Sequence, residues 1–174
     1  MHVLQWIAVK AETADEAYDN VESQLQNYLN ETPDWYDWFI CGGGRFNVSE
    51  KEDWKEAYVE GKTNMIVSSD DLAAFTERIQ QCIEYRIDEY RNYQSQWNRS
   101  GIDLNAKLDS YTGNMDYDFG LYPLKKMLDM NQGTWDYNAY FYDLENWSTN
   151  PAHMLKDIND VGGVWYLVPV DFHY

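Results

Sequence analysis

The sequence predicts an α+β fold: a ferredoxin-like antiparallel sheet with two main helices on one face and an inserted region. Segments typical of strands and of amphipathic helices follow one another in the order β-α-β-β-α-insertion-β-α-β. The first part of this order matches a split βαβ unit. With 174 residues, 44% of them hydrophobic, the chain is large enough for a single domain over residues 1–174 with a buried core.

Five segments have the composition of strands, because they are rich in β-branched and aromatic residues. The first is apolar on both faces, which favours a central position in the sheet. Pro169 lies inside the last segment and predicts an edge strand or a bulge there. The five segments are residues 2–9, 35–41, 64–67, 138–143 and 164–173.

Apolar residues at helical spacing predict two main helices. Thr13 and Glu16 form a capping box at the start of the first, over residues 13–29. Ser68 or Ser69 is the expected cap of the second, which runs to about residue 97 and ends near a glycine. Shorter helices are expected at 50–60, 102–108, 122–130 and 151–158, and we interpret 101–137 as an insertion on the core fold.

The chain is strongly acidic, with 30 acidic and 13 basic residues and a net charge of −17. Such an excess repels nucleic acid and acidic membranes and attracts basic surfaces. Two interpretations stay open, a surface that only confers solubility and an acidic face that binds a basic protein. On the long helix, Arg78, Arg86 and Arg91 are interleaved with acids, which indicates solvated ion pairs.

The two cysteines, Cys41 and Cys82, fall in a strand and on an apolar helix stripe, so both are expected in the core. No C-x-x-C motif supports a zinc or redox site. The start of the chain lacks the pattern of a signal peptide, and no apolar run reaches the length of about 20 residues that a membrane span needs. We therefore expect a soluble, cytoplasmic protein.

A run of three glycines before an arginine is the most constrained stretch of the chain. Its backbone amides could form an anion-binding nest that Arg45 completes, with Phe46 and nearby tryptophans stacking on a base. The alternative is a hairpin turn whose arginine pairs with a nearby carboxylate. The candidate ligand-binding residues are Trp35, Trp38, Gly42, Gly43, Gly44 and Arg45.

The ends of the chain hold a weak candidate metal site. In a ferredoxin-like sheet the first and last strands are antiparallel neighbours, which places His2 near Asp171 and His173. Two histidines and a carboxylate can bind a divalent metal, although terminal histidines also occur by chance. The chain has no serine elbow, no Cys–His pairing and no H-E-x-x-H motif, so we expect no enzyme activity and no cofactor.

Several stretches combine aspartate with tyrosine. Tyrosine offers a large contact area, and aspartate complements lysine and arginine. This composition suits a surface that binds a basic protein; the alternative is that the aromatic rings belong to the core. The candidate partner-binding residues are Asp116, Tyr117, Asp118, Tyr122, Asp136, Tyr137, Tyr142 and Asp143.

Three short motifs stand out: Asp34-Trp35-Tyr36, Gly43-Gly44-Arg45-Phe46 and Val170-Asp171-Phe172-His173. With them the chain resembles a group of uncharacterised proteins met mostly in bacteriophages and their hosts. That group usually has tryptophan where this chain has Phe46, and the insertion has no counterpart in it. The resemblance implies a phage-type origin and a compact α+β fold, and it implies no activity.

Together these observations predict an acidic phage-type interaction protein of the host cytoplasm. It would bind and block a basic host protein that binds nucleic acid or acts in defence, as anti-restriction or anti-CRISPR proteins do, by mimicry of DNA. It would bind neither nucleic acid nor membranes directly. The alternative is a module that binds or sequesters a nucleotide at the turn Gly42–Arg45, and a homodimer through an edge strand is also open.

Overall fold

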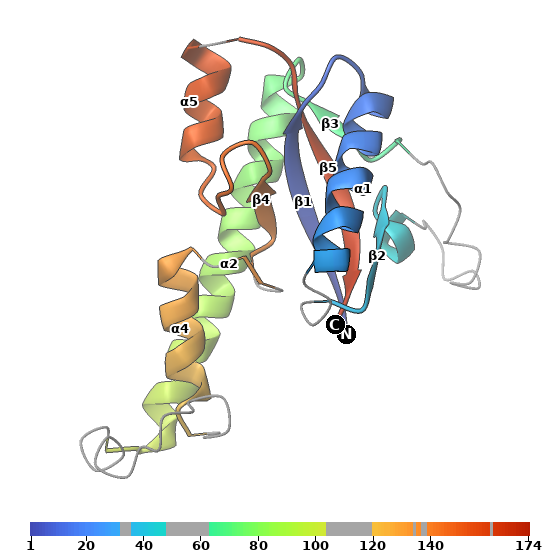
Figure 1. Cartoon of the computed structure of the whole chain (residues 1–174). Helices are drawn as coiled ribbons and strands as arrows, with labels where there is room; N and C mark the ends of the chain where they lie inside the picture. The colour runs from blue at the N-terminus through green and yellow to red at the C-terminus, as the bar shows by residue number, and fades with distance from the viewer. Residues whose placement is uncertain (32–35, 48–62, 104–119, 134, 137–138, 161) are drawn as a thin grey trace.

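The computed structural model describes residues 1–31, 36–47, 63–103, 120–133, 135–136, 139–160 and 162–174 (Figure 1). A five-stranded sheet carries helices, which confirms the α+β class. The strand order is β2-β5-β1-β4, and β3 lies beside β5 on the same side as β2.

Strands β1 (His2–Lys10) and β5 (Trp165–His173) form the centre of the sheet. They pair antiparallel along their whole length, from His2 opposite His173 to Lys10 opposite Trp165. All of β5 except His173 is buried, as expected for a strand that is covered on both faces. The central position predicted for the first strand is therefore confirmed.

The outer strands make the sheet mixed. Strands β2 (Trp38–Cys41) and β3 (Val67–Ser68) run antiparallel to β5, whereas β4 (Phe141–Asp143) runs parallel to β1. The prediction of a purely antiparallel sheet was wrong, and the ferredoxin-like topology is not confirmed. A parallel pair needs a long crossover, and the helical segment between β3 and β4 provides it.

The main helices cover opposite faces of the sheet (Figure 1). Helix α1 (Ala14–Glu31) packs on one face, and α2 (Leu72–Ser100) packs on the other. Helix α5 (Ala152–Asp160) adds Met154 to the cluster under α2. The prediction of two helices on one face was wrong.

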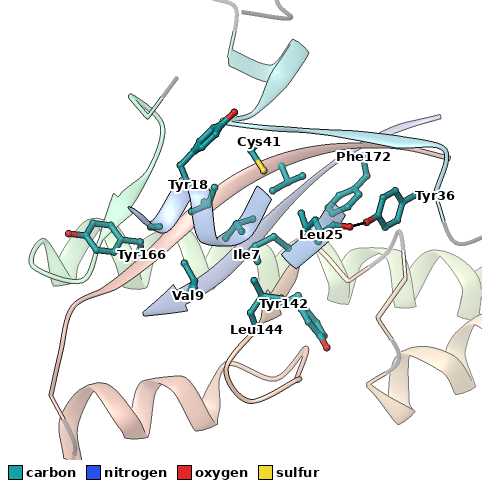
Figure 2. Close-up of a cluster of buried hydrophobic side chains, with 14 residues drawn as sticks. Ile7, Val9, Tyr18, Leu25, Tyr36, Cys41, Tyr142, Leu144, Tyr166 and Phe172 are labelled. Carbon is teal, nitrogen blue, oxygen red and sulfur yellow. Dashed lines mark hydrogen bonds between the residues drawn. The ribbon is translucent and has the colours of Figure 1, made fainter. Parts of the chain in front are cut away.

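Side-chain alternation along β1 explains the two helical layers. Ile7 and Val9 belong to the cluster under α1, whereas Trp6 and Ala8 belong to the cluster under α2. Both faces are apolar, so both need a helical cover. Figure 2 shows the α1 side, where the buried Tyr36 hydroxyl donates to the carbonyl of a helix residue, Leu25, at 2.8 Å.

Pro169 lies in the central strand, so the edge alternative for it was wrong. Trp6 is the residue of β1 that is paired with Pro169, and its amide donates to the Tyr140 carbonyl on the β4 side. The missing N–H of Pro169 therefore costs no hydrogen bond between β1 and β5. The Pro169 carbonyl accepts from the amides of Gly42 and Gly43, at 2.8 and 2.9 Å. Two successive amides on one carbonyl form a β-bulge, but its extra residue lies in the glycine segment after β2. Strand β5 itself pairs with β1 residue by residue, so the bulge alternative for the last segment was also wrong.

Helix α1 starts with the predicted capping box, but one of its two hydrogen bonds is shifted by one residue. The Glu16 amide donates to Thr13 Oγ1 at 3.1 Å, as expected. The Glu16 carboxylate accepts from the amide of Glu12 at 2.8 Å, instead of from the amide of Thr13. Both contacts fix the point at which the chain leaves β1 and enters the helix.

Helix α2 starts later than the serines predict. Its N-cap is Asp71, whose carboxylate accepts from the Ala74 amide at 3.1 Å. Ser69 instead takes part in the sheet edge, where its hydroxyl oxygen accepts from the Trp165 amide at 2.9 Å. The helix ends at Gly101, whose φ of +64° is the left-handed cap that glycine favours.

The C-terminal half of α2 extends beyond the sheet and carries α4 (Tyr122–Gln132) alongside it (Figure 1). Tyr93, Met127 and Met130 form the buried contact between the two helices. The helix expected at 122–130 is confirmed. The helices expected at 50–60 and over most of 102–108 lie outside the described residues.

The buried face of α1 yields a test of the layer arrangement. Leu25 lies on the buried face of α1, whereas Leu128 is exposed on α4. We expect Leu25→Ala to lower the free energy of unfolding by about 2–5 kcal/mol, because it leaves a cavity in the core. The matched change Leu128→Ala should cost less than about 1 kcal/mol in urea unfolding. Equal losses would contradict this packing.

Candidate functional site

Both ends of the chain meet at one corner of the sheet. Three side chains cluster there, because His2, His173 and Trp38 occupy paired positions of β1, β5 and β2. The rings of Trp38 and His173 stack at 5.0 Å and 2°, and His2 meets both rings edge-on at about 5 Å. The predicted proximity of His2 and His173 is therefore real.

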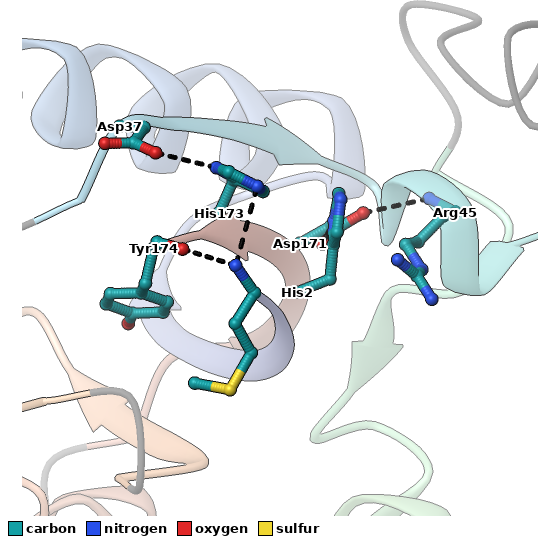
Figure 3. A network of polar contacts seen from close by, with 7 residues as sticks. His2, Asp37, Arg45, Asp171, His173 and Tyr174 are labelled. Carbon is teal, nitrogen blue, oxygen red and sulfur yellow. Dashed lines mark hydrogen bonds and ion pairs between the residues drawn. The ribbon is translucent and has the colours of Figure 1, made fainter.

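Carboxylates hold this corner together (Figure 3). His2 Nδ1 lies 2.9 Å from Asp171 Oδ1, and His173 Nδ1 lies 2.8 Å from Asp37 Oδ2. The N-terminal amino group donates to the carbonyl of Tyr174. The two histidines thus bond to different carboxylates.

This geometry is that of a hydrogen-bond network and not of a shared ligand set. Within the described ranges, no three His, Cys, Asp or Glu side chains are arranged to hold a metal ion. The weak metal candidate His2, Asp171 and His173 is brought together, but each imidazole already has a carboxylate partner at Nδ1.

The glycine turn bonds to the protein itself. Gly42, Gly43 and Gly44 all have positive φ, between +47° and +89°. The first two amides donate to Pro169, and the Arg45 amide donates to Asp171 Oδ2 at 3.1 Å (Figure 3). The turn therefore binds a carboxylate of the protein itself, that of Asp171.

Of the predicted tryptophans, only Trp38 is described, and it lies away from the turn. Trp38 packs on the terminal histidines, and Trp35 lies outside the described residues. The guanidinium of Arg45 is exposed and lies 5.6 Å from the ring of Phe46. Nucleotide binding by the turn stays a prediction, and the amides of Gly42, Gly43 and Arg45 are not free to support it.

Asp171 is a buried carboxylate in a tight space. Burial raises its pKa, while the hydrogen bonds from His2 and Arg45 act in the opposite direction. Gly44 leaves room for it: a Cβ atom on Gly44 would lie 2.7 Å from the Asp171 Cβ. The turn, the first strand and the last strand are thus joined at this one side chain.

The predicted acid–aromatic surface is only partly present. Tyr142 and Asp143 are buried, so they do not form a binding surface, and this part of the prediction was wrong. Strand β4 is covered on both faces, since Phe141 and Tyr142 belong to different core clusters. Tyr142 stacks on Trp135 at 3.8 Å.

The remaining members of that set have separate surroundings. The Asp143 carboxylate accepts from the Asn146 amide and side chain, while burial raises its pKa. Asp136 pairs with Lys126 at 3.3 Å, and Tyr122 lies edge-on to Tyr93. Asp116, Tyr117, Asp118 and Tyr137 lie outside the described residues.

A more continuous acidic surface lies on α1. The sequence contains no lysine or arginine between Lys10 and Arg45, and the carboxylates at the start of the helix are exposed. Acidic residues in the first turn of a helix interact favourably with the helix dipole. From the sequence alone, that interaction was enough to explain these acids. We call the following exposed residues the α1 face: Glu12, Asp15, Glu16, Asp19 and Glu22.

Two clefts flank α1. A groove of about 560 Å³ lies along it and is lined by Asp19, Glu22 and Phe39, among others. On its other flank a smaller cleft of about 220 Å³ lies beside Trp135 and Trp147. The side chain of Trp147 is 70% exposed, the largest exposure among the large hydrophobic residues described. Acidic and aromatic groups are therefore adjacent on this side of the molecule.

Comparison with protein-family models, curated protein sequences and solved structures gives no match to this chain. Among the described helices, none has both the length and the apolar character that crossing a membrane requires.

The contact between Gly44 and Asp171 can be tested with two glycines. Both glycines have a left-handed backbone, so replacement of either by alanine has a similar backbone cost. A Cβ atom at Gly44 would in addition clash with Asp171, whereas the space around Gly101 is open. We expect a loss of about 1 kcal/mol for Gly101→Ala and about 1–3 kcal/mol more for Gly44→Ala in chemical unfolding. Equal losses would show that Asp171 is not packed against the turn.

The raised pKa of Asp171 predicts a pH dependence. A group whose pKa is higher in the folded state stabilises the fold below its unfolded pKa, about 3.8, and this contribution is lost as pH rises through the folded pKa. The stability of the wild type relative to Asp171→Asn should therefore fall as the pH rises above 3.8, by about 1.4 kcal/mol per unit of difference between the folded and unfolded pKa. A relative stability that rises with pH would mean that His2 and Arg45 outweigh burial.

Proposed function

We propose that this chain is an acidic interaction protein whose α1 face binds a basic surface on a protein that handles nucleic acid. The observation that carries the proposal is the row of exposed carboxylates on the α1 face, in a stretch without any lysine or arginine. No ion pair within the described residues neutralises Asp15 or Asp19. The row therefore presents its full charge to a partner.

The carboxylates of the α1 face are spaced more widely than phosphates along the DNA axis, but by distances of the same order. Asp15, Asp19 and Glu22 are four and three residues apart, which corresponds to about 6 Å and 4.5 Å along a helix. One strand of duplex DNA carries a phosphate about every 3.4 Å of its axis. A basic groove that binds phosphates by releasing counterions can thus bind this helix as a short acidic substitute.

Aromatic groups beside α1 supply a second part of the interface. Trp147 projects next to the helix, and Phe39 lines the groove on the opposite flank. Exposed tryptophans are frequent hot spots of protein interfaces, because they bury a large area on binding. Charge would bring the partner to the α1 face, and these rings would retain it.

The biological setting of the proposal comes from the sequence. The three motifs that resemble phage-type proteins support a role in blocking a host nucleic-acid-binding or defence protein, of the anti-restriction or anti-CRISPR type. The blocked partner would be one whose DNA or RNA groove accepts the α1 face. Duplex DNA should then compete with this protein for the same groove.

The experiment is a pull-down from bacterial lysate with two charge-matched variants. One variant neutralises the α1 face with Asp15→Asn, Asp19→Asn and Glu22→Gln. The other neutralises three exposed acids of α2 with Glu77→Gln, Glu84→Gln and Asp88→Asn. Both change the net charge by the same three units, so only the position of the charge differs.

We expect the wild type to retain nucleic-acid-binding proteins at about 0.05 M salt and release them at about 0.5 M, where exposed charges are screened. The α1 variant should lose most of this retention, the α2 variant should keep it, and added duplex DNA should abolish it. Equal loss of retention in both variants would show that binding depends on the overall negative charge and not on its position on the α1 face. Retention that withstands salt and DNA would contradict the proposal.

A further inference from the structure

A second hollow lies on the other side of the sheet, away from the α1 face. This cleft of about 340 Å³ lies between α2 and the beginning of β1, and its lining includes His2, Trp6, Arg78 and Tyr85. Its volume is in the range of small-molecule sites, about 300–1,000 Å³. The proposed function makes no use of it.

Arg78 is the cation of this cleft. Its guanidinium lies over the Trp6 ring, 4.3 Å from the ring centre, and Nη1 donates to Gln81 at 2.7 Å. Its buried Nε has no hydrogen-bond partner, and among the described residues no carboxylate pairs with it. An arginine has five N–H donors, so most of these are unused in a protein with 30 acidic residues. A guanidinium held flat with free donors is suited to a phosphate or carboxylate.

Two further groups lie in or beside the cleft. His2 lines the cleft, and its Nδ1 is occupied by Asp171, so Nε2 is the nitrogen available to a ligand. The exposed Arg45 lies beside Phe46, which also lines the cleft. The lining thus contains an arginine and a histidine and no carboxylate, although the chain as a whole is strongly acidic.

Aromatic rings form the walls of the same cleft. Tyr85 is 60% exposed and Phe46 is 40% exposed, so both present ring surface to solvent. Tyr85 lies 5.7 Å from Tyr140, with an angle of 37° between the rings. The backbone of Tyr140 has a φ of +58°, which is strained for a bulky residue and is typical of functional positions. A planar ring would cover these surfaces by stacking.

We propose that this cleft binds a mononucleotide. Arg78 binds the phosphate, with Arg45 and His2 at its edge, and the base stacks against Tyr85, Tyr140 and Phe46. The site differs from the turn Gly42–Arg45, because side chains and not backbone amides make the contacts. It lies on the opposite face of the sheet from the α1 face, so the two binding activities are separable.

Calorimetric titration of the full chain with three probes tests the chemistry. Adenosine 5′-monophosphate carries both ring and phosphate, adenosine carries the ring alone, and inorganic phosphate carries the anion alone. We expect the nucleotide to bind, and each part alone to bind at least tenfold more weakly. If adenosine or phosphate binds as tightly as the nucleotide, or if nothing binds at millimolar concentration, the proposal is overturned.

Matched variants test the place of binding. Arg78→Gln should weaken nucleotide binding at least tenfold, whereas Arg91→Gln should leave it unchanged, because Arg91 is exposed on the same helix and pairs with Asp88 at 3.1 Å. Tyr85→Ala removes an exposed ring and decides the question if Arg78→Gln does not fold, as judged by thermal unfolding. Binding within twofold of the wild type in a folded Arg78 or Tyr85 variant refutes the site. The α1 variant should bind the nucleotide normally, which separates this outcome from that of the proposed function.

Discussion

The antiparallel pairing of β1 with β5 is the interaction on which the rest of the structure depends. It joins the two ends of the chain over nine residues of each strand, and it thereby closes the chain into a loop. Closing so long a loop costs conformational entropy, which extensive burial must offset. The two strands carry apolar side chains on both faces, and each face requires its own helix. The position of α1, of α2 and of the three clefts follows from this pair.

Much of the fold could be predicted because its signals are local. Hydrophobic periodicity located the helices, and capping residues placed the start of α1 within one residue of its observed position. The proximity of His2 to Asp171 and His173 followed from one topological rule, that the first and last strands are neighbours. That rule holds here although the ferredoxin-like topology from which it was taken is not confirmed. A single correct strand pairing was enough to place these residues together.

What could not be predicted depends on which surfaces the tertiary fold covers. Tyr142 and Asp143 have the composition of a binding surface, but β4 is covered on both faces and buries them. Arg78 has the spacing of a solvated ion-pairing residue, as Arg91 indeed is, yet it faces the sheet and lies over Trp6. Neither difference is visible in a sequence, because both depend on how the helices cover the two faces of the sheet. The α1 face escaped notice for a related reason, since the helix dipole already explained its acids.

The sheet separates two surfaces of opposite chemistry, and this makes the net charge a poor guide to binding. The helical layers on the two faces are separated by more than the Debye length of about 8 Å at physiological salt, so the carboxylates of α1 are largely screened from the cleft beside Arg78. The lining of the cleft contains Arg78, several aromatic rings and no carboxylate. His2 connects this cleft to Asp171, which in turn fixes the glycine turn that carries Arg45 and Phe46. A ligand bound at His2 would therefore act directly on the residue that joins both ends of the chain, and its binding would stabilise the central strand pair.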